Sequence, residues 1–213
     1  MKGKKIKILI VDDHAVMREG LKRILNECDD LRVVDEACSG EEAIEKVNAG
    51  SFDLVMLDIS MPGRGGMDAL KEMRRIRPEL PVLVLSMYPD DQYALRAFRA
   101  GAAGYVMKER SPDELVDAIH KVSSGGTHVT PSLAEKLAAH LAAGLPERPH
   151  EKLSDREDQV MRMLATGRSL KEIATELDLS VKTVSTYKRR IFQKTKLRNA
   201  AELIRYTIDN DLI

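Results

Sequence analysis

Short apolar runs alternate with stretches of helical periodicity through the first 125 residues of the chain. The runs are too short for helices and most are rich in β-branched residues, so they predict strands. They occupy residues 6–11, 31–34, 54–57, 82–85 and 105–107. Between the first two runs, Met17, Leu21 and Leu25 recur at the spacing of one helix face. This alternation predicts a doubly wound α/β fold, with helices on both faces of a five-stranded parallel sheet.

The last third of the chain shows a different pattern, in which three helix starts follow one another closely. Ser154-x-x-Glu157 and Ser169-x-x-Glu172 are capping-box sequences, and Ser180 is placed to cap a third helix. Only two residues separate the second helix from this last cap, which is typical of a helix-turn-helix in a small all-α domain. On the third helix, the residues predicted to face the core are Val181, Val184, Tyr187 and Ile191. The residues predicted on the opposite, polar face are Lys182, Ser185, Thr186, Arg189 and Gln193.

A connecting segment separates these two patterns. Residues 123–130 contain consecutive glycines, residues 131–143 are rich in Ala and Leu and predict a short helix, and residues 144–150 contain two prolines. The prediction is therefore a first domain over residues 1–125, a linker with a short helix over 126–150, and a second domain over 151–213.

The charge of the chain sums to zero, but it is unevenly distributed. Residues 1–125 carry 19 basic and 22 acidic side chains, and residues 151–213 carry 13 basic and 10 acidic ones. Residues 179–201 contain seven basic side chains and no acidic one. A solvated helix face usually mixes both signs, so this stretch favours a polyanionic partner.

Composition excludes several classes of protein. A hydrophobic content of 43% with 32% charged residues indicates a core-forming chain. The absence of Trp and the aromatic content of 4% argue against a base-stacking platform for RNA or single strands. The cysteines, Cys28 and Cys38, have no metal-ligand spacing, and no apolar run approaches the roughly 20 residues of a membrane span. We expect a cytoplasmic protein that does not bind membranes.

Polar residues stand at the ends of the predicted strands. Asp12 and Asp13 follow the first strand, Asp58 the third, Ser86 the fourth and Lys108 the fifth. Because the carboxyl ends of parallel strands meet at one edge of a sheet, these side chains should converge there. Close carboxylates repel one another, and Mg²⁺ relieves the repulsion while retaining waters and a phosphate oxygen. With a lysine and a hydroxyl nearby, the set suits phosphoryl transfer onto a carboxylate.

These residues also carry a family resemblance. Asp12-Asp13, Asp58-x-x-Met61-Pro62, Ser86 and Gly104-Tyr105-x-x-Lys108 resemble the receiver domain of two-component response regulators, which has a flavodoxin-like fold. The resemblance implies that Asp58 accepts phosphate from a sensor histidine kinase, assisted by Lys108. It implies Mg²⁺ bound directly by Asp13 and Asp58, by Asp12 through water, and by the Ser60 backbone carbonyl. It also implies that Ser86 and Tyr105 form a switch pair.

Simpler interpretations exist for single residues. Asp12 and Asp13 could cap a helix that begins near His14, and Tyr105 alone is more often a core residue. His14 lies beside the acids, but we do not expect it to bind metal. Many receivers have Pro after the lysine, joined by a cis peptide bond, whereas Glu109 follows here. A phosphatase with an aspartate nucleophile is disfavoured because residues 12–16 lack its DxDx[TV] pattern, and a flavodoxin-like cofactor binder because no phosphate-binding loop follows the first strand.

Residues 153–198 resemble the LuxR/NarL-type helix-turn-helix, so that nearly the whole chain resembles a NarL/FixJ-family response regulator. This implies binding to double-stranded DNA, with base contacts from Ser185, Thr186 and Arg189. The side chains expected to contact phosphates are Lys171, Lys182, Thr183, Tyr187 and Lys188, with Tyr187 equally compatible with a core position. The last helix, residues 200–208, is expected to form a homodimer contact on DNA through Ala200, Leu203 and Ile204.

The sequence therefore predicts a transcription regulator that is controlled by phosphorylation and is not an enzyme. One alternative is a regulator that binds DNA without phosphorylation. A second is a switch whose basic helix binds an acidic protein surface.

Overall fold

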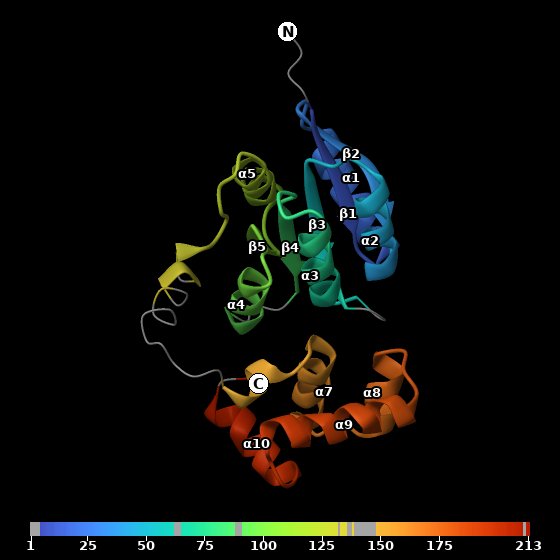
Figure 1. Ribbon diagram of the computed structural model, residues 1–213, viewed down its shortest axis with the longest axis vertical. Helices are drawn as coiled ribbons and strands as arrows, with labels where there is room; N and C mark the ends of the chain where they lie inside the picture. The colour runs from blue at the N-terminus through green and yellow to red at the C-terminus, as the bar shows by residue number, and fades with distance from the viewer. Residues whose placement is uncertain are drawn as a thin grey trace. The chain divides into compact units, whose positions relative to one another are not determined.

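The structure is a computed structural model that describes residues 5–61, 65–87, 91–131, 133–135, 138, 148–210 and 212–213. The chain divides into two compact units, Met1–Gly144 and Leu145–Ile213. The first unit combines strands and helices, and the second contains helices (Figure 1). Each unit has buried apolar clusters of its own.

The first unit is built on a five-stranded parallel sheet with the strand order β2-β1-β3-β4-β5. The strands are β1 (Ile6–Val11), β2 (Leu31–Ala37), β3 (Leu54–Asp58), β4 (Val82–Ser86) and β5 (Gly104–Met107). The connections reverse direction at β1, which has β2 on one side and β3 on the other. In doubly wound sheets ligands bind beyond the carboxyl ends of the strands at this switch point, so the order positions the candidate site. The predicted fold class is confirmed.

Helices cover both faces of the sheet (Figure 1). They are α1 (Ala15–Asn26), α2 (Gly40–Ala49), α3 (Gly66–Ile76), α4 (Asp91–Arg99) and α5 (Pro112–Ser123). One face carries α1 and α5, where Leu25 packs in a cluster with Ile8. The other face carries α2, α3 and α4, where Leu70 packs in a cluster with Leu9. Because successive strand residues point to opposite faces, the neighbours Ile8 and Leu9 belong to different cores.

Strand β2 is three residues longer than the apolar run that predicted it. Asp35 and Glu36 belong to the strand, although both are charged. Lys46 Nζ lies 2.7 Å from Asp35 Oδ1, and Lys22 Nζ lies 2.7 Å from Glu36 Oε1. An edge strand can carry such residues because its side chains reach partners on the adjoining helices.

The beginning of the predicted linker packs on the first unit. The amide of Tyr105 donates to the carbonyl of His128 at 3.2 Å, and the amide of His128 donates to the carbonyl of Ala103 at 3.1 Å. Leu133 is 4% exposed and joins the same apolar cluster as Tyr105. The compact unit thus extends past the boundary predicted at residue 125. Most of the predicted helix over 131–143 and residues 144–147 of the linker lie outside the described residues.

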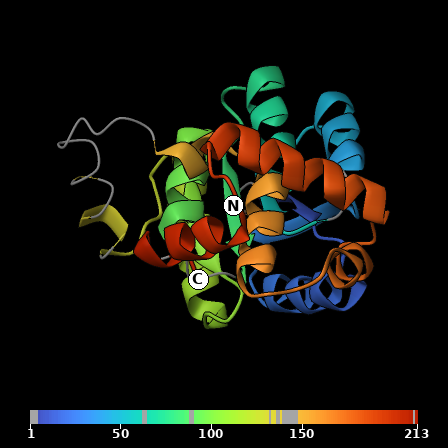
Figure 2. The same ribbon diagram turned by 90° about the horizontal axis from the view of Figure 1, so that it is seen from below.

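The second unit contains helices packed around one apolar cluster (Figure 2). They are the 3₁₀ helix η1 (Pro149–Lys152) and the α-helices α7 (Asp155–Ala165), α8 (Leu170–Glu176), α9 (Val181–Thr195) and α10 (Ala200–Asp209). Helix α9 packs against both α7 and α8, and α10 packs against α7. Val160, Ile173 and Ile191 are fully buried at the centre of this cluster.

Part of the core predicted for α9 is wrong. Val184 and Ile191 are fully buried and Tyr187 is half-buried, as its predicted position requires. Val181, however, is 43% exposed. It is the first residue of the helix, where the chain has only just entered the packed layer, so the angular pattern overestimates its burial. Among the described residues, none of the helices has the length and apolarity needed to cross a membrane.

Candidate functional site

Four strands bring the predicted pocket residues to one edge of the sheet. Asp12 directly follows β1, Asp58 ends β3, Ser86 ends β4 and Lys108 directly follows β5. Asp58 pairs with Leu85 in the register of β3 and β4, so Ser86 lies one residue further along the neighbouring strand. The convergence expected from the sequence is therefore present in the fold.

Lys108 joins the two most deeply buried acids. Its Nζ lies 2.6 Å from Asp12 Oδ2 and 2.7 Å from Asp58 Oδ2. The Lys108 side chain is 4% exposed, and both carboxylates are fully buried. Burial alone would lower the pKa of Lys108, but Asp58 and Asp12 outweigh it and raise this pKa above its ordinary value of 10.5. Lys108 thus stays an ammonium group whose charge is directed at Asp58.

The environment of Asp58 is set by burial and by two donors. Burial raises the pKa of Asp58 above its ordinary value of 3.8, while Lys108 and the backbone amide of Ser60 oppose that rise. The Ser60 amide donates to Asp58 Oδ1 at 2.8 Å, and Lys108 binds Oδ2. Each carboxylate oxygen therefore has a donor that favours its anionic form.

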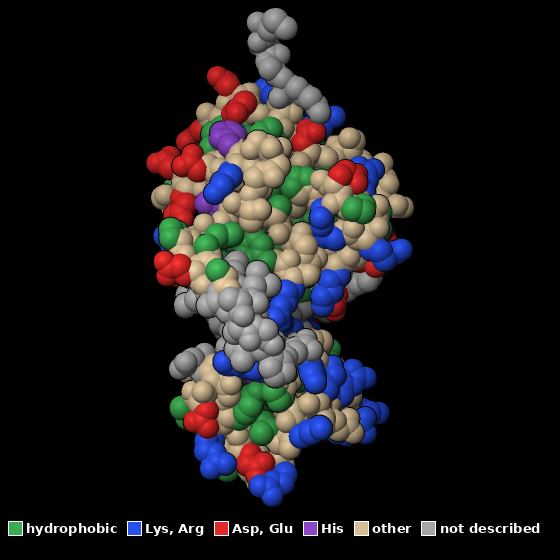
Figure 3. Space-filling view, turned by 60° about the vertical axis from the view of Figure 1, so that its left-hand side comes forward, with side chains coloured by type: hydrophobic (Ala, Val, Ile, Leu, Met, Phe, Trp, Pro, Cys, Tyr) green, Lys and Arg blue, Asp and Glu red, His purple; other side chains and the backbone are tan. Residues whose placement is uncertain are grey.

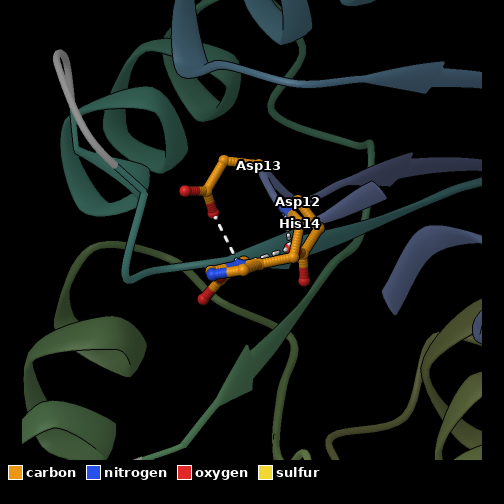
Figure 4. A group of neighbouring side chains, drawn as sticks. Asp12, Asp13 and His14 are labelled. Carbon is orange, nitrogen blue, oxygen red and sulfur yellow. Dashed lines mark hydrogen bonds and ion pairs between the residues drawn. The ribbon is translucent and has the colours of Figure 1, made fainter. Parts of the chain in front are cut away.

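Asp13 and His14 lie at the more open side of the cluster. The Nδ1 atom of His14 is 3.1 Å from Asp13 Oδ1 and 3.2 Å from Asp12 Oδ1 (Figure 4). Asp13 Oδ1 is buried, yet it has no hydrogen-bond partner among the described residues. Ligand atoms of Asp12, Asp13, His14 and Asp58 all lie within 4.8 Å of one another. An unsatisfied carboxylate oxygen in such a group fits a divalent cation.

Two residues that the sequence did not single out shape this pocket. Arg18 Nη1 donates to the carbonyl of Asp12 at 2.7 Å and holds the backbone that follows β1. Gly66 begins α3, and a Cβ atom at this position would lie 2.2 Å from the carbonyl oxygen of Asp58. Arg18 could have been noticed because it lies one helical turn after His14; the contact of Gly66 with Asp58 depends on the tertiary fold.

The predicted switch residues are both buried. Ser86 is fully buried at the end of β4, and Tyr105 is 6% exposed within the cluster that also contains residues of α4. The amide of Lys108 donates to the carbonyl of Ser86 at 2.8 Å, which ties the ends of β4 and β5 together. Among the described residues no peptide bond is cis, so the bond from Lys108 to Glu109 is trans. Pro62, the last residue of the motif after Asp58, lies outside the described residues.

The helix-turn-helix of the second unit is formed by α8 and α9. Ser169 and Glu172 form a complete capping box at the start of α8, and the Ser180 hydroxyl accepts the amide of Thr183 at the start of α9. In the turn, Asp178 has a φ of 52°, a left-handed conformation that Asp tolerates better than most residues. The amide of Leu179 then donates to the carbonyl of Ala174 at 2.8 Å and closes the turn.

The side chains predicted to contact DNA differ in exposure. The exposed members of the set are Lys171, Lys182, Ser185 and Arg189. The partly buried members are Thr183, Thr186, Tyr187 and Lys188. Basic side chains gather on the second unit in Figure 3. Tyr187 packs against the apolar cluster, so much of its ring serves the core.

The predicted dimer contact on α10 needs one correction. Ala200 is exposed and Ile204 is 37% exposed, but Leu203 is 1% exposed in the core of its own unit. Leu203 faces inward because its domain needs an apolar residue there, so its prediction as a dimer contact is wrong. Ile208, which the sequence did not single out, is 58% exposed. It lies one turn after Ile204 on the same helix.

Comparison with known families divides the chain in the same way. Residues 8–120 match the family described as response regulator receiver domain. Residues 151–207 match the family described as bacterial regulatory proteins, luxR family. The receiver match contains all the pocket residues, and the luxR match contains α8 and α9.

Relatives and solved structures agree with these matches. The chain is 37% identical over 215 residues to the oxygen regulatory protein NreC of Staphylococcus carnosus (strain TM300), covering 98% of this chain and 99% of NreC. It is 36% identical over 208 residues to the response regulator UvrY of Escherichia coli O157:H7, covering 97% and 95%. A structure of RcsB from Salmonella enterica serovar Typhimurium, bound to promoter rprA in the presence of the phosphomimetic BeF3−, aligns with a TM-score of 0.61 at 26% identity, covering 95% of this chain and 98% of that one. The protein therefore belongs to the NarL/FixJ family of two-component response regulators, which join a receiver domain to a LuxR-type DNA-binding domain and regulate transcription.

Proposed function

We propose that Asp58 accepts a phosphoryl group from a sensor histidine kinase and that this modification controls DNA binding by the second unit. The observation that carries the proposal is the position of Lys108 Nζ, 2.7 Å from Asp58 and 2.6 Å from Asp12 in a buried cluster. A buried ammonium between two carboxylates supplies the positive charge that an incoming phosphoryl group requires.

The transfer forms one bond and breaks another. An Asp58 carboxylate oxygen attacks the phosphorus of a phosphohistidine, the phosphorus–nitrogen bond breaks, and an acyl phosphate remains on Asp58. The amide of Ser60 holds one carboxylate oxygen, which fixes the orientation of the group. The Lys108 ammonium can then shift its contact from the Asp58 carboxylate to the phosphoryl oxygens. The protein acts here as a phosphoryl acceptor, and we propose that it has no other enzymatic role.

The pocket fits Mg²⁺ as its cofactor. Asp13 and Asp58 would bind the ion directly together with the Ser60 carbonyl, and Asp12 would bind it through water. The support is the unsatisfied Oδ1 of Asp13 and the presence of three carboxylates beside the single ammonium of Lys108, an excess of two negative charges. When bound, Mg²⁺ would neutralise phosphoryl oxygens beside Asp58.

Ser86 and Tyr105 are proposed as the switch that reports phosphorylation. The Ser86 hydroxyl would move toward the phosphoryl group, and the Tyr105 ring would repack against α4. The amide of Tyr105 is bonded to the carbonyl of His128, in the segment that leads toward the second unit. A change at Tyr105 can therefore act on the segment that follows the receiver. We propose residues 1–125 as the receiver, 126–150 as a linker whose beginning packs on the receiver, and 151–213 as the DNA-binding domain.

The second unit is proposed to read double-stranded DNA with the outer face of α9. Ser185, Thr186 and Arg189 would contact bases in the major groove. The proposed phosphate contacts are Lys171, Lys182, Thr183, Tyr187 and Lys188. The exposure of Lys182, Ser185 and Arg189 on one side of α9 supports DNA binding by this face.

A homodimer on DNA is proposed to form through α10. Ala200 and Ile204 are available for the contact, and the exposed Ile208 replaces Leu203 as its third member. Two copies would then bind paired half-sites. Such a regulator works on chromosomal DNA, and we propose a cytoplasmic location.

The proposal is tested by measuring the mass of the intact protein after incubation with a small acyl phosphate and Mg²⁺. We expect one added phosphoryl group on the wild type and none on Asp58→Asn. Asp53→Asn is a matched control, because Asp53 directly precedes β3 whereas Asp58 ends it, and it should gain the group normally. No addition to the wild type, or addition to Asp58→Asn, would contradict the proposal.

A further inference from the structure

We propose that His14 supplies a nitrogen ligand to the divalent cation of the pocket and biases the site toward Mn²⁺ relative to Mg²⁺. This inference rests on the proposed function, because it concerns the cation held by Asp13 and Asp58. It assigns a role in metal selectivity to a residue that the sequence alone does not favour as a ligand.

The distance from the His14 ring to Asp13 is compatible with two neighbouring ligands of one cation. Nδ1 lies 3.1 Å from Asp13 Oδ1 and 3.2 Å from Asp12 Oδ1. Neighbouring ligands of an octahedral ion with bonds of about 2.1 Å are themselves about 3.0 Å apart. Figure 4 shows the ring facing both carboxylates from the start of α1. His14 Nδ1 and Asp13 Oδ1 could thus occupy adjacent corners around one cation with little movement, with Asp12 bound through water.

A hydrogen bond alone does not account for this arrangement. A proton on Nδ1 can be donated to Asp12 Oδ1, but the same proton cannot also satisfy Asp13 Oδ1. Within the described part of the chain, Asp13 Oδ1 remains buried without a hydrogen-bond partner. With the proton on Nε2, Nδ1 offers a lone pair, and a cation can then accept electrons from Nδ1 and from Asp13 Oδ1.

The His14 ring is not used to cap the helix that follows it. His14 occupies the N-cap position of α1, yet its side chain makes no capping hydrogen bond. Its backbone amide donates to Asp12 Oδ1 at 2.8 Å, which fixes the ring close to the acids. The side chain is 67% exposed, so the cation would keep waters beside it.

The chemistry of the two ions gives the direction of the bias. Mg²⁺ prefers oxygen ligands and retains its waters, so a water replaces imidazole at small cost. Mn²⁺ also favours oxygen ligands, but it is a first-row transition ion of the Irving–Williams series and binds an imidazole nitrogen more strongly than Mg²⁺ does. A nitrogen in the ligand set therefore raises the affinity for Mn²⁺ more than that for Mg²⁺.

The test compares ion binding by the full chain in the wild type, His14→Ala and His120→Ala. His120 is a matched control because Nε2 also contacts a carboxylate, Asp30 Oδ2 at 2.9 Å, on a residue outside the acidic cluster. Calorimetry gives the dissociation constants of Mn²⁺ and Mg²⁺. Electron spin echo modulation of bound Mn²⁺ detects a directly bonded imidazole nitrogen, which a purely structural role of His14 would not produce.

We expect His14→Ala to lower the ratio of Mn²⁺ to Mg²⁺ affinity by about tenfold, the scale on which the loss of a metal-site contact acts. The nitrogen modulation should disappear in His14→Ala and persist in His120→Ala. An unchanged ratio with no nitrogen modulation in the wild type would overturn the role of His14 and leave the proposed magnesium site intact. Absence of saturable binding of either ion to the wild type would overturn both.

Discussion

The charged residues of the pocket and those of α9 differ in burial and in pairing. In the pocket, Asp12 and Asp58 are fully buried and Lys108 contacts both. On α9, Lys182 and Arg189 are exposed, and neither has an ion pair within the part of the chain that the structure describes. The pocket therefore holds its charges against one another, whereas Lys182 and Arg189 of α9 present theirs to solvent.

This difference separates the expected effects of substitution. Removing one member of a buried ion pair leaves its partner desolvated and uncompensated, so folding stability falls. Removing an exposed, unpaired charge changes folding little and alters the binding of a charged partner instead. The pocket residues should therefore affect stability as well as phosphorylation, and those of α9 chiefly DNA binding.

The largest loss of folding stability is expected for Lys108→Met. It leaves the carboxylates of Asp12 and Asp58 buried without their ammonium, which costs about 3–5 kcal/mol. Hydrogen exchange of the β3 amides across a urea series measures this loss. Lys182→Met on α9 is the comparison and should stay within about 0.5 kcal/mol. Equal losses of folding stability in the two variants would contradict the difference between the pocket and α9.

Gly66→Ala tests whether backbone packing also supports the pocket. The new Cβ would lie 2.2 Å from the carbonyl oxygen of Asp58, and relieving such overpacking costs about 1–3 kcal/mol. Gly20→Ala is a matched control in the middle of α1, where a Cβ meets nothing within 4 Å. It should stabilise the unit by about 1 kcal/mol through helix propensity. If Gly66→Ala left the free energy of unfolding unchanged, the backbone that follows β3 would have to move without cost to accept the Cβ atom.

Arg189→Ala and Lys188→Ala sharpen the description of α9. Arg189→Ala should cost about 1–3 kcal/mol of DNA binding and relax the preference at one base position. Lys188→Ala should weaken binding to all duplexes about equally and reduce the salt slope by about 1. Binding titrations over several salt concentrations measure both quantities, and the reverse pattern would reassign the two residues.

The smallest effect on folding stability is expected from lowering the pH, which protonates a buried acid of the second unit. Burial would raise the pKa of Glu157, but Lys194 Nζ at 2.5 Å and the amide of Ser154 outweigh it and hold the pKa below 4.5. The folded state therefore gains stability from Glu157 above about pH 4.5 and loses it as the pH falls through the lower folded pKa.

Thermal unfolding of α7, followed by NMR between pH 3 and 7 (roughly the range in which the carboxyl titrates), measures this dependence. Glu157→Gln should flatten the curve. An unchanged slope in Glu157→Gln would assign the pH dependence to other groups.

The sequence predicted most of the pocket because strand ends are encoded locally. The runs that end at Asp12, Asp58 and Ser86 stop where apolar residues stop, and parallel topology then brings them together. The contact between Gly66 and Asp58 and that between Arg18 and Asp12 depend on how helices approach the sheet. No periodicity in the sequence encodes those approaches.

The misassigned residues have a similar origin. Helical periodicity placed Val181 in the core, and the resemblance to the LuxR/NarL-type domain implied that Leu203 is a dimer contact. In the structure Val181 is 43% exposed and Leu203 is 1% exposed. Periodicity gives the angle of a residue around its helix, but burial also depends on where along the helix its neighbours pack. The packing of Leu133 and the bond from Tyr105 to His128 were missed because glycines in residues 123–130 suggested an open linker.

The central claim is that phosphorylation of Asp58 controls DNA binding. The most direct measurement is the affinity of the full chain for a duplex with paired half-sites, selected in vitro, with and without a small acyl phosphate at fixed salt. We expect phosphorylation to tighten binding of the wild type about tenfold, equivalent to about 1.4 kcal/mol, and to leave Asp58→Asn unchanged. Equal affinity of the phosphorylated and unphosphorylated wild type would contradict the claim and indicate a regulator that binds DNA without phosphorylation.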